Sequence, residues 1–330
     1  MAKDQELRKV RDIIKSERIS FETEKNRLNR QIAQLRRPPD GLSLREQLAY
    51  QFPYEPHSYF PSFIWQTAKL RPTHPKFRRK EEVKSWDTLN PDFVHEVLTD
   101  ETSLALIRNL YVHMPNIVEA YENMPSPILR ADFFRYLVLL ARGGIYTDID
   151  TFDLKPILDW IPAEMDASKI GLVIGIEADP DRPDWKDWYA RRIQFCQWTI
   201  QAKPGHPVLR DIVAKITDEY LTRKSNGNLQ LAKGNSFGSE IMEWTGPGSW
   251  TDSVFDYLND PVKSGLKSSV GIENFTGLKK PTLFADVLVL PITSFSPGVK
   301  QMGAQDIDHP LAFVQHVFEG SWKNDKPKMK

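Results

Sequence analysis

Apolar residues return every seven positions over the first 37 residues of the chain. This stripe consists of Leu7, Ile14, Phe21, Leu28 and Leu35. Charged side chains fill most positions between them, and a second heptad position is only half filled, which predicts a long helix with a narrow apolar seam. Pro38-Pro39-Asp40-Gly41 ends that helix, because proline lacks a backbone donor and glycine favours a turn. We expect a helical stem and linker over 1–40, which either packs on its own domain or joins copies of the chain.

Beyond residue 60, short apolar runs alternate with longer helical patterns. The expected strands are 62–67, 93–98, 145–150, 171–176 and 286–290. The expected helices are 80–89, 102–109, 126–141, 189–202 and 208–220. This alternation predicts an α/β fold with a mostly parallel sheet, in one catalytic domain over 41–330.

Composition narrows the class of protein. The 44 Lys and Arg residues balance 44 Asp and Glu residues, which argues against a protein that holds nucleic acid by its overall field. A single cysteine, Cys196, excludes an intramolecular disulfide and any multi-cysteine metal site. No apolar run approaches the roughly 18 residues that cross a bilayer, so the chain as given is expected to be soluble.

The segment 126–153 carries the clearest local signals. Ser126-Pro127 predicts a helix start and Gly143-Gly144 a helix stop. The strand that follows ends in Asp148-Ile149-Asp150, and carboxylates two apart on a strand point to the same side. Because ligands of α/β folds bind at the carboxyl ends of strands, the pair predicts a Mg²⁺ or Mn²⁺ site.

Asp132 and Arg135 lie three positions apart on the preceding helix, so they share one of its faces. On a surface they would form an ion pair worth only about 0–1 kcal/mol. The helix is otherwise apolar along its middle, which indicates burial against the sheet. Two buried charged groups need a polar partner, and a sugar diphosphate would supply one.

These motifs resemble a known family. Asp132-x-x-Arg135 followed by Gly143-Gly144-x-Tyr146-x-Asp148-x-Asp150 is similar to the nucleotide-sugar-binding core of glycosyltransferase family 32, which recurs in clostridial glucosylating toxins. The flanking motifs that agree in order are Ile64–Thr67, Ser85-Trp86, Leu89–Pro91, Thr245–Gly248, His316 and Gly320–Lys323. The resemblance spans about Pro61 to Lys323, and within the family it is greatest to fungal Golgi enzymes that add the first α-1,6-branching mannose to the N-glycan core.

The resemblance implies a GT-A type, Rossmann-like fold and a retaining, metal-dependent transfer of mannose from GDP-mannose. It implies that Asp132 and Arg135 hold the donor sugar, and that Tyr146 bounds the ribose or sugar pocket. Asp148 would meet the ribose and a Mn²⁺ or Mg²⁺ ion, and Asp150 would bind that ion directly. Retention without a marked nucleophile favours same-face attack by the acceptor.

Other assignments leave alternatives open. The resemblance implies that Trp65 stacks on the base, although core packing is nearly as favoured. It makes His316 a candidate third metal ligand, although a histidine among apolar neighbours is more often structural. Ser321 and Trp322 would form a lid over the diphosphate. The candidate acceptor residues, which could equally form a solvated acidic loop beside a helix, are Glu177, Asp179, Asp181, Trp185, Trp188 and Trp198.

The location and partners also follow from the resemblance. It implies a Golgi membrane protein with a lumenal catalytic domain, anchored by a segment that this chain does not include, so that the chain would be a soluble truncation. An N-glycan on a glycoprotein would be the acceptor. A homo-oligomer could form through the stem, and no nucleic acid partner is expected.

Three other functions compete with this interpretation. The first is another nucleotide-sugar transferase of the same family. The second is a phosphatase of the haloacid dehalogenase type, in which Asp148 would be the nucleophile; this class also needs a late acidic pair on a glycine turn, which the chain does not clearly supply. The third is a non-catalytic subunit of a transferase complex, which the intact Asp148, Asp150 and Arg135 do not favour.

Overall fold

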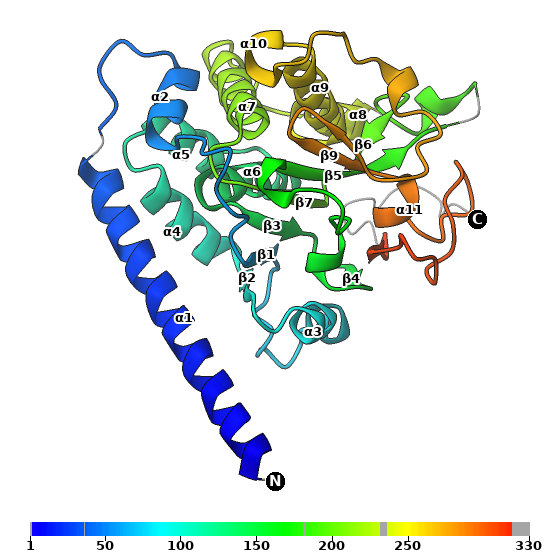
Figure 1. The fold of residues 1–330 in the computed structure, drawn as a ribbon. Coiled ribbons are helices and arrows are strands. Elements are labelled where there is room, and N and C mark those ends of the chain that lie inside the picture. Colours follow the sequence, from blue (N-terminus) through cyan, green and yellow to red (C-terminus); the bar gives the residue numbers. More distant parts are fainter. Residues whose placement is uncertain (1, 36, 181–182, 232–235, 319–330) are drawn as a thin grey trace.

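The computed structural model describes residues 2–35, 37–180, 183–231 and 236–318. A central twisted sheet organises the chain (Figure 1). The strands are β1 (Phe63–Thr67), β2 (Val94–Leu98), β3 (Gly144–Thr147), β4 (Thr151–Asp153), β5 (Leu172–Ala178), β6 (Gln194–Phe195), β7 (Thr199–Ala202), β8 (Thr282–Phe284), β9 (Val287–Leu290) and β10 (Val314–His316). The main sheet has the order β2-β1-β3-β7-β5-β9-β8, with β6 paired to β5, while β10 and β4 form a separate two-stranded sheet.

The main sheet is mixed, whereas the sequence pattern predicts a mostly parallel one. β1 runs parallel to both β2 and β3, and β5 runs parallel to β9. β7, however, lies antiparallel between β3 and β5. The prediction fails over 189–202, which was expected to be a helix and instead supplies β6 and β7. Strand β7 is fully buried, and β-branched side chains such as those of Thr199 and Ile200 pack well in a buried strand.

Helices cover both faces of the sheet (Figure 1). The helices are α1 (Ala2–Leu35), α2 (Leu44–Gln51), α3 (Lys80–Leu89), α4 (Asp100–Leu110), α5 (Pro115–Glu122), α6 (Pro127–Arg142), α7 (Pro207–Ser225), α8 (Ser236–Trp244), α9 (Pro247–Leu258), α10 (Pro261–Ser264) and α11 (Ile292–Phe295). The larger apolar core joins one face of the sheet to α4 through α9. The smaller core joins the other face to α3, α11 and the two-stranded sheet.

Neighbouring residues of one strand point into different cores, as the pleat requires. Trp65 and Tyr146 belong to the larger core, while Ile64 and Ile145 belong to the smaller one. The two layers of helices around a mixed sheet confirm the α/β class that the sequence predicts.

Two glycines fix the junction between α6 and β3. Gly143 and Gly144 both have positive φ, at 62° and 91°, where a side chain would be strained. A Cβ atom on Gly144 would lie 2.6 Å from the carbonyl oxygen of Phe63, so β3 could not approach β1 this closely with any other residue there. The predicted helix stop is therefore confirmed, and it sets the depth of β3 in the sheet.

The predicted N-terminal helix is present as α1, which runs along one side of the molecule (Figure 1). The described members of its stripe are exposed: Ile14, Phe21 and Leu28. Two side-chain hydrogen bonds connect α1 to the body, from Arg18 to Ser62 at 3.0 Å and from Arg142 to Asn26 at 2.8 Å. None of the α1 side chains that the structure describes belongs to either apolar core.

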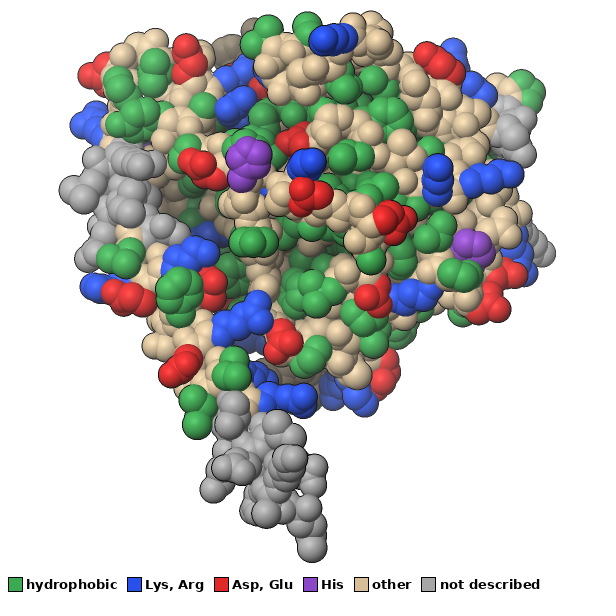
Figure 2. Space-filling model, in the orientation of Figure 1, with side chains coloured by type: hydrophobic (Ala, Val, Ile, Leu, Met, Phe, Trp, Pro, Cys, Tyr) green, Lys and Arg blue, Asp and Glu red, His purple; other side chains and the backbone are tan. Residues whose placement is uncertain are grey.

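The surface carries both signs of charge. Lysine and arginine side chains alternate with aspartate and glutamate side chains over the face shown in Figure 2. This distribution agrees with the balanced composition and shows no single-sign field on that face. Among the described residues, no helix combines the length and apolarity that crossing a membrane requires.

Candidate active site

Asp148 and Asp150 lie in a turn directly after β3, and β4 begins at Thr151. The sequence pattern had extended the strand through Asp150; the strand ends at Thr147 instead. The Asp148 N–H still donates to the Trp198 carbonyl at 2.8 Å, so the neighbouring strand β7 continues to hold the start of the turn.

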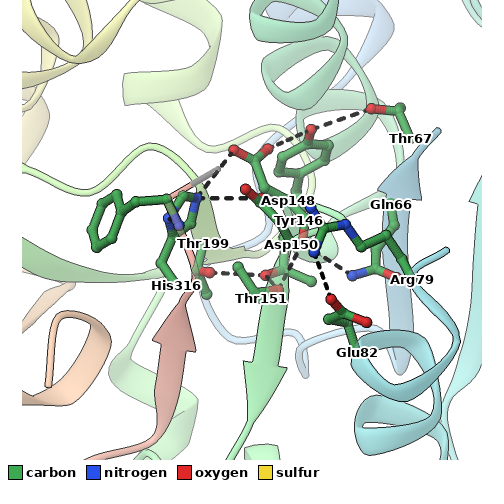
Figure 3. Close-up of polar contacts among 12 residues, drawn as sticks. Gln66, Thr67, Arg79, Glu82, Tyr146, Asp148, Asp150, Thr151, Thr199 and His316 are labelled. Atoms are coloured by element: carbon green, nitrogen blue, oxygen red, sulfur yellow. Dashed lines mark hydrogen bonds and ion pairs between the residues drawn. The ribbon is translucent and has the colours of Figure 1, made fainter. Parts of the chain in front are cut away.

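The small sheet brings His316 to this turn. β10 pairs antiparallel with β4, and the register places His316 opposite Thr151. The Nε2 atom of His316 lies 3.4 Å from Oδ1 of Asp150 and 4.0 Å from Oδ2 of Asp148, as Figure 3 shows. The three side chains offer ligand atoms that all lie within 4.8 Å of one another. Two carboxylates and an imidazole form a donor set that suits a divalent transition metal.

Two further contacts keep His316 in place. Its ring packs against the Trp198 indole, with the ring centroids 4.9 Å apart. One residue later, the Val317 N–H donates to the Asp150 carbonyl at 3.0 Å. The candidate ligands are therefore linked through their backbones as well as through their side chains.

Asp132 and Arg135 lie on α6 and are almost completely buried, with 2% and 4% of their surface exposed. Nη2 of Arg135 lies 2.9 Å from Oδ1 of Asp132. The Thr245 hydroxyl donates to the other oxygen of Asp132 at 2.8 Å. Burial raises the pKa of Asp132 to about 6, although Arg135 and Thr245 oppose that rise.

Arg135 links Asp132 to the turn that carries Asp148 and Asp150. Its Nη2 also lies 3.4 Å from Oδ1 of Asp148, and its guanidinium lies 5.1 Å from the centroid of the Tyr146 ring. The Tyr146 hydroxyl donates to the same Asp148 oxygen at 2.9 Å. Burial acts to raise the pKa of Asp148, but Arg135, His316 and Tyr146 hold it below its ordinary value.

Arg135 also carries unused hydrogen-bonding capacity. Its Nε and Nη1 atoms are buried and have no hydrogen-bond partner within the part of the chain that the structure describes. Burial disfavours the charge, yet the Asp148 and Asp132 carboxylates raise the pKa of Arg135 above its ordinary value. A buried cation with free donors needs an anionic or polar ligand, and a diphosphate or a sugar hydroxyl meets that need.

Helix α3 supports β4 on the side away from β10. The Trp86 indole donates to the Thr151 carbonyl at 3.2 Å, and the Asp153 N–H donates to the Ser85 hydroxyl at 2.9 Å. The Asn90 amide donates to the Asp153 carboxyl at 2.6 Å. Burial raises the pKa of Asp153 to about 8, so this carboxyl is neutral at pH 7.

The remaining predicted residues lie elsewhere or outside the described range. Trp65 lies in the larger core, where its indole donates to the Gly143 carbonyl at 2.9 Å, and a role toward a base stays a prediction. Ser321 and Trp322 fall outside the described residues, as does Asp181. Asp179 accepts from the Gly277 N–H at 2.5 Å, near the expected acceptor side.

Two residues that contact the site could not be identified from the sequence pattern alone. Thr245 was noted only as the start of a glycine-rich loop, yet it is the hydroxyl partner of Asp132. Gln66 was noted only as part of a flanking motif, yet its amide donates to the Asp148 carbonyl at 3.1 Å. Their distance along the chain from Asp132 and Asp148 leaves no local signal, and only the motif order pointed to them.

Comparisons with known proteins agree with this geometry. The family described as "Glycosyltransferase sugar-binding region containing DXD motif" matches residues 76–166, which include α6 and the Asp148–Asp150 turn. The initiation-specific alpha-1,6-mannosyltransferase of Candida albicans is 52% identical over 87% of this chain and 78% of its own length. The Schizosaccharomyces pombe protein of that name is 50% identical over 84% of this chain and 67% of its own length.

Two further similarities are more distant. A Saccharomyces cerevisiae protein described as a glycosyltransferase, HOC1, is 43% identical over 92% of this chain and 76% of its own length. Among solved structures, the PaToxG glycosyltransferase covers 72% of this chain and 83% of its own, at 16% identity and a TM-score of 0.40.

Proposed function

This chain belongs to the glycosyltransferase family of the initiation-specific alpha-1,6-mannosyltransferases, and from that premise we propose that it transfers mannose from GDP-mannose to an N-glycan core. The new bond would be an α-1,6 linkage formed with retention of anomeric configuration. The observation that carries the proposal is the meeting of Asp148, Asp150 and His316 beside a buried arginine with unused donors.

Asp148, Asp150 and His316 would hold the divalent metal, for which we propose Mn²⁺ or Mg²⁺. Their ligand atoms lie close enough to share one ion, and the carboxylates suit either metal. A bound metal would stabilise the negative charge of the diphosphate as it leaves. The low pKa of Asp148 keeps this carboxylate ionised and ready to bind a cation.

Arg135 and Asp132 would hold the donor. The free Nε and Nη1 donors of Arg135 would bind a phosphate or sugar oxygen. Asp132, with one oxygen on Arg135 and the other on Thr245, would accept from a mannose hydroxyl. Tyr146 would bound this pocket, and the proposed role of Trp65 is to support the base from the core side.

The reaction that fits retention is same-face attack. The acceptor hydroxyl oxygen forms a bond to the anomeric carbon while the bond from that carbon to the β-phosphate oxygen breaks, and the departing phosphate takes the hydroxyl proton. Detection of a mannosyl-enzyme adduct by mass spectrometry would contradict this mechanism. The proposed setting is the Golgi lumen, with N-glycans of glycoproteins as acceptors.

The deciding experiment measures thermal stability with GDP or UDP, each with and without Mn²⁺. A ligand that binds only the folded state raises the unfolding midpoint in proportion to its affinity, so GDP with Mn²⁺ is expected to stabilise far more than UDP with Mn²⁺. Transfer of mannose from GDP-mannose to an N-glycan core, with the linkage read by NMR, completes the test. Stabilisation by UDP alone would favour another nucleotide-sugar transferase, and turnover of phosphomonoesters would favour a phosphatase.

A further inference from the structure

A chain of hydrogen bonds runs from the protein surface to the backbone of the metal-site turn. It begins at Asp87 on α3, whose Oδ1 lies 2.9 Å from Nδ1 of His95 on β2. Nε2 of His95 lies 2.9 Å from Oε1 of Gln66 on β1. The Nε2 atom of Gln66 donates to the Asp148 carbonyl at 3.1 Å, and Figure 3 shows Gln66 beside this turn.

The directions of these bonds follow from what each group can donate. The Asp148 carbonyl only accepts, so the NH₂ end of Gln66 must face it and its Oε1 must face His95. That oxygen also only accepts, so Nε2 of His95 must carry a hydrogen. The Asp87 carboxylate accepts as well, which requires a hydrogen on Nδ1. The complete chain therefore needs His95 as an imidazolium, with both ring nitrogens protonated.

We propose that His95 is a positioning residue for the glycosyltransferase reaction: as an imidazolium it aligns Gln66, and through Gln66 it fixes the carbonyl of Asp148 and the turn that holds the metal. This inference rests on the proposed function only in taking Asp148 as a metal ligand. His95 touches neither Asp148 nor the candidate metal, because Gln66 lies between them. The Asp148 carbonyl accepts a second hydrogen bond from the Thr151 hydroxyl at 2.6 Å, so loss of the Gln66 contact would loosen the turn without unfolding it.

The charged groups that bear on His95 come from two elements. Asp87 faces it from α3 and Glu96 adjoins it on β2, while the group facing it from β1 is the neutral amide of Gln66. Burial lowers the pKa of His95, and both carboxylates oppose that effect. The pKa of His95 remains below its ordinary value, so the imidazolium forms only on the acidic side of that value and is lost as the pH rises.

Deprotonation of His95 breaks the series of hydrogen bonds between His95 and Gln66. The bond from Nδ1 to the Asp87 carboxylate is charge-assisted, and such bonds are stronger than bonds to a neutral amide. The remaining proton therefore stays on Nδ1, and Nε2 presents a lone pair to Oε1 of Gln66. Two acceptors then face each other, Gln66 turns away, and the Asp148 carbonyl loses one of its donors.

Three substitutions separate the donation of a hydrogen bond to Gln66 from the titration of His95. In Asp87→Asn the new amide donates to Nδ1, so a neutral His95 keeps its proton on Nε2 and holds Gln66 at every pH. In His95→Gln the new amide donates to Gln66 without titrating. His95→Leu removes the donor altogether. Asp87 is partly exposed to solvent, so the Asp87→Asn protein is expected to fold normally.

The experiment measures the affinity for Mn²⁺ with GDP, and separately with UDP, from about pH 5 to about pH 8, a range that spans the ordinary pKa of histidine. Relative to His95→Leu, the wild-type protein should bind roughly three- to tenfold more tightly at the acidic end, as expected for one hydrogen bond, and should lose that advantage at the basic end. Asp87→Asn and His95→Gln should keep it throughout. Any effect of pH that the four proteins share cancels in the ratio to His95→Leu at each pH, so the ratios isolate the role of His95.

A second readout needs no metal or nucleotide. The NMR chemical shifts of the His95 ring nitrogens in the metal-free protein should report an imidazolium at acidic pH and an Nδ1–H tautomer at basic pH, and an Nε2–H tautomer in Asp87→Asn. The proposal is overturned if the wild-type and Asp87→Asn proteins show the same tautomer and the same pH dependence of binding. If neither nucleotide binds while the tautomers behave as described, the proposed function is wrong, but the inferred hydrogen bonds from Asp87 through His95 and Gln66 to Asp148 are still supported.

Discussion

Replacement of Thr245 by valine isolates the contribution of one hydroxyl to the charge of Asp132. The Thr245 side chain is fully buried and donates to Oδ2 of Asp132 at 2.8 Å. Valine has nearly the same shape, so Thr245→Val removes the hydrogen bond with little change in packing. Thr245→Ser is the matched control, because it keeps the hydroxyl and removes a methyl group instead.

The size of the effect follows from the pKa of Asp132, which burial raises to about 6. A hydrogen bond to a charged group contributes about 1.5–3 kcal/mol. Because about 1.4 kcal/mol corresponds to one pKa unit, Thr245→Val should raise the pKa of Asp132 by roughly one to two further units. At pH 7 the wild-type carboxyl is mostly ionised, whereas the variant carboxyl would be half or more protonated.

The sign for stability follows from the same linkage. The folded-state pKa lies above the unfolded value, so the contribution of Asp132 to the free energy of unfolding is fully present below about pH 4 and is lost as the pH rises through about 6. Thr245→Val removes the bond to the ionised form of Asp132. It should therefore destabilise the protein more at pH about 8, where the wild-type carboxyl is ionised, than at pH about 5, where the carboxyl is mostly protonated in both proteins, by about 1 kcal/mol or more.

Two assays check this prediction. Urea unfolding at the two pH values measures the difference in stability, and titration of Mn²⁺ with GDP measures binding as a function of pH. As the pH falls, binding weakens once Asp132 becomes protonated. In Thr245→Val this loss should begin at a pH roughly one to two units higher than in the wild type or in Thr245→Ser, which matches the expected change in the pKa of Asp132. The reasoning is refuted if Thr245→Val folds, yet binds with the same pH dependence as Thr245→Ser.

Three further predictions concern the metal site and the stem. Asp150→Asn should abolish the stabilisation by Mn²⁺ with GDP and the transfer of mannose, because it removes a proposed ligand. The control is Asp306→Asn, since Asp306-Ile307-Asp308 is an exposed Asp-x-Asp sequence elsewhere in the chain. This control should leave the unfolding midpoint with Mn²⁺ and GDP unchanged. His316→Gln should weaken Mn²⁺ binding by at least about tenfold, the loss typical even of an outer-shell partner; titration calorimetry beside the exposed-site control His57→Gln checks this. Deletion of residues 1–40 should leave nucleotide binding unchanged, since none of the described side chains of α1 belongs to either apolar core. Sedimentation of both proteins would show whether the exposed apolar stripe of α1 joins copies of the chain.

Local signals account for what could be predicted from the sequence. Pro127 starts α6 and Gly143 ends it, as proline at a first turn and glycine at a helix end do generally. The acidic turn then follows within a few residues, so one short segment carries both the framework and the main carboxylates. The burial of Asp132 and Arg135 also followed, because an apolar helix leaves charged side chains no exposed face.

The features that could not be predicted from the sequence depend on packing between distant segments of the chain. The segment 189–202 has apolar and aromatic residues that suit a helix or a buried strand equally, and only the gap between β3 and β5 decides in favour of β7. His316 could be named only as a candidate, because its role depends on the pairing of β10 with β4. Thr245 was marked only by its place in a flanking motif, and nothing in the sequence indicated that its hydroxyl would bind Asp132.

The pairing of β10 with β4 has a consequence for biosynthesis. A ribosome delivers Asp148 and Asp150 long before His316, so a nascent chain that ends between them has two of the proposed metal ligands and lacks the third. The Val317 N–H that binds the Asp150 carbonyl is also still missing at that stage. If these residues bind a metal as proposed, tight binding would have to wait until β10 has left the ribosome and paired with β4. Folding of the main sheet and binding of the metal would then be separate steps.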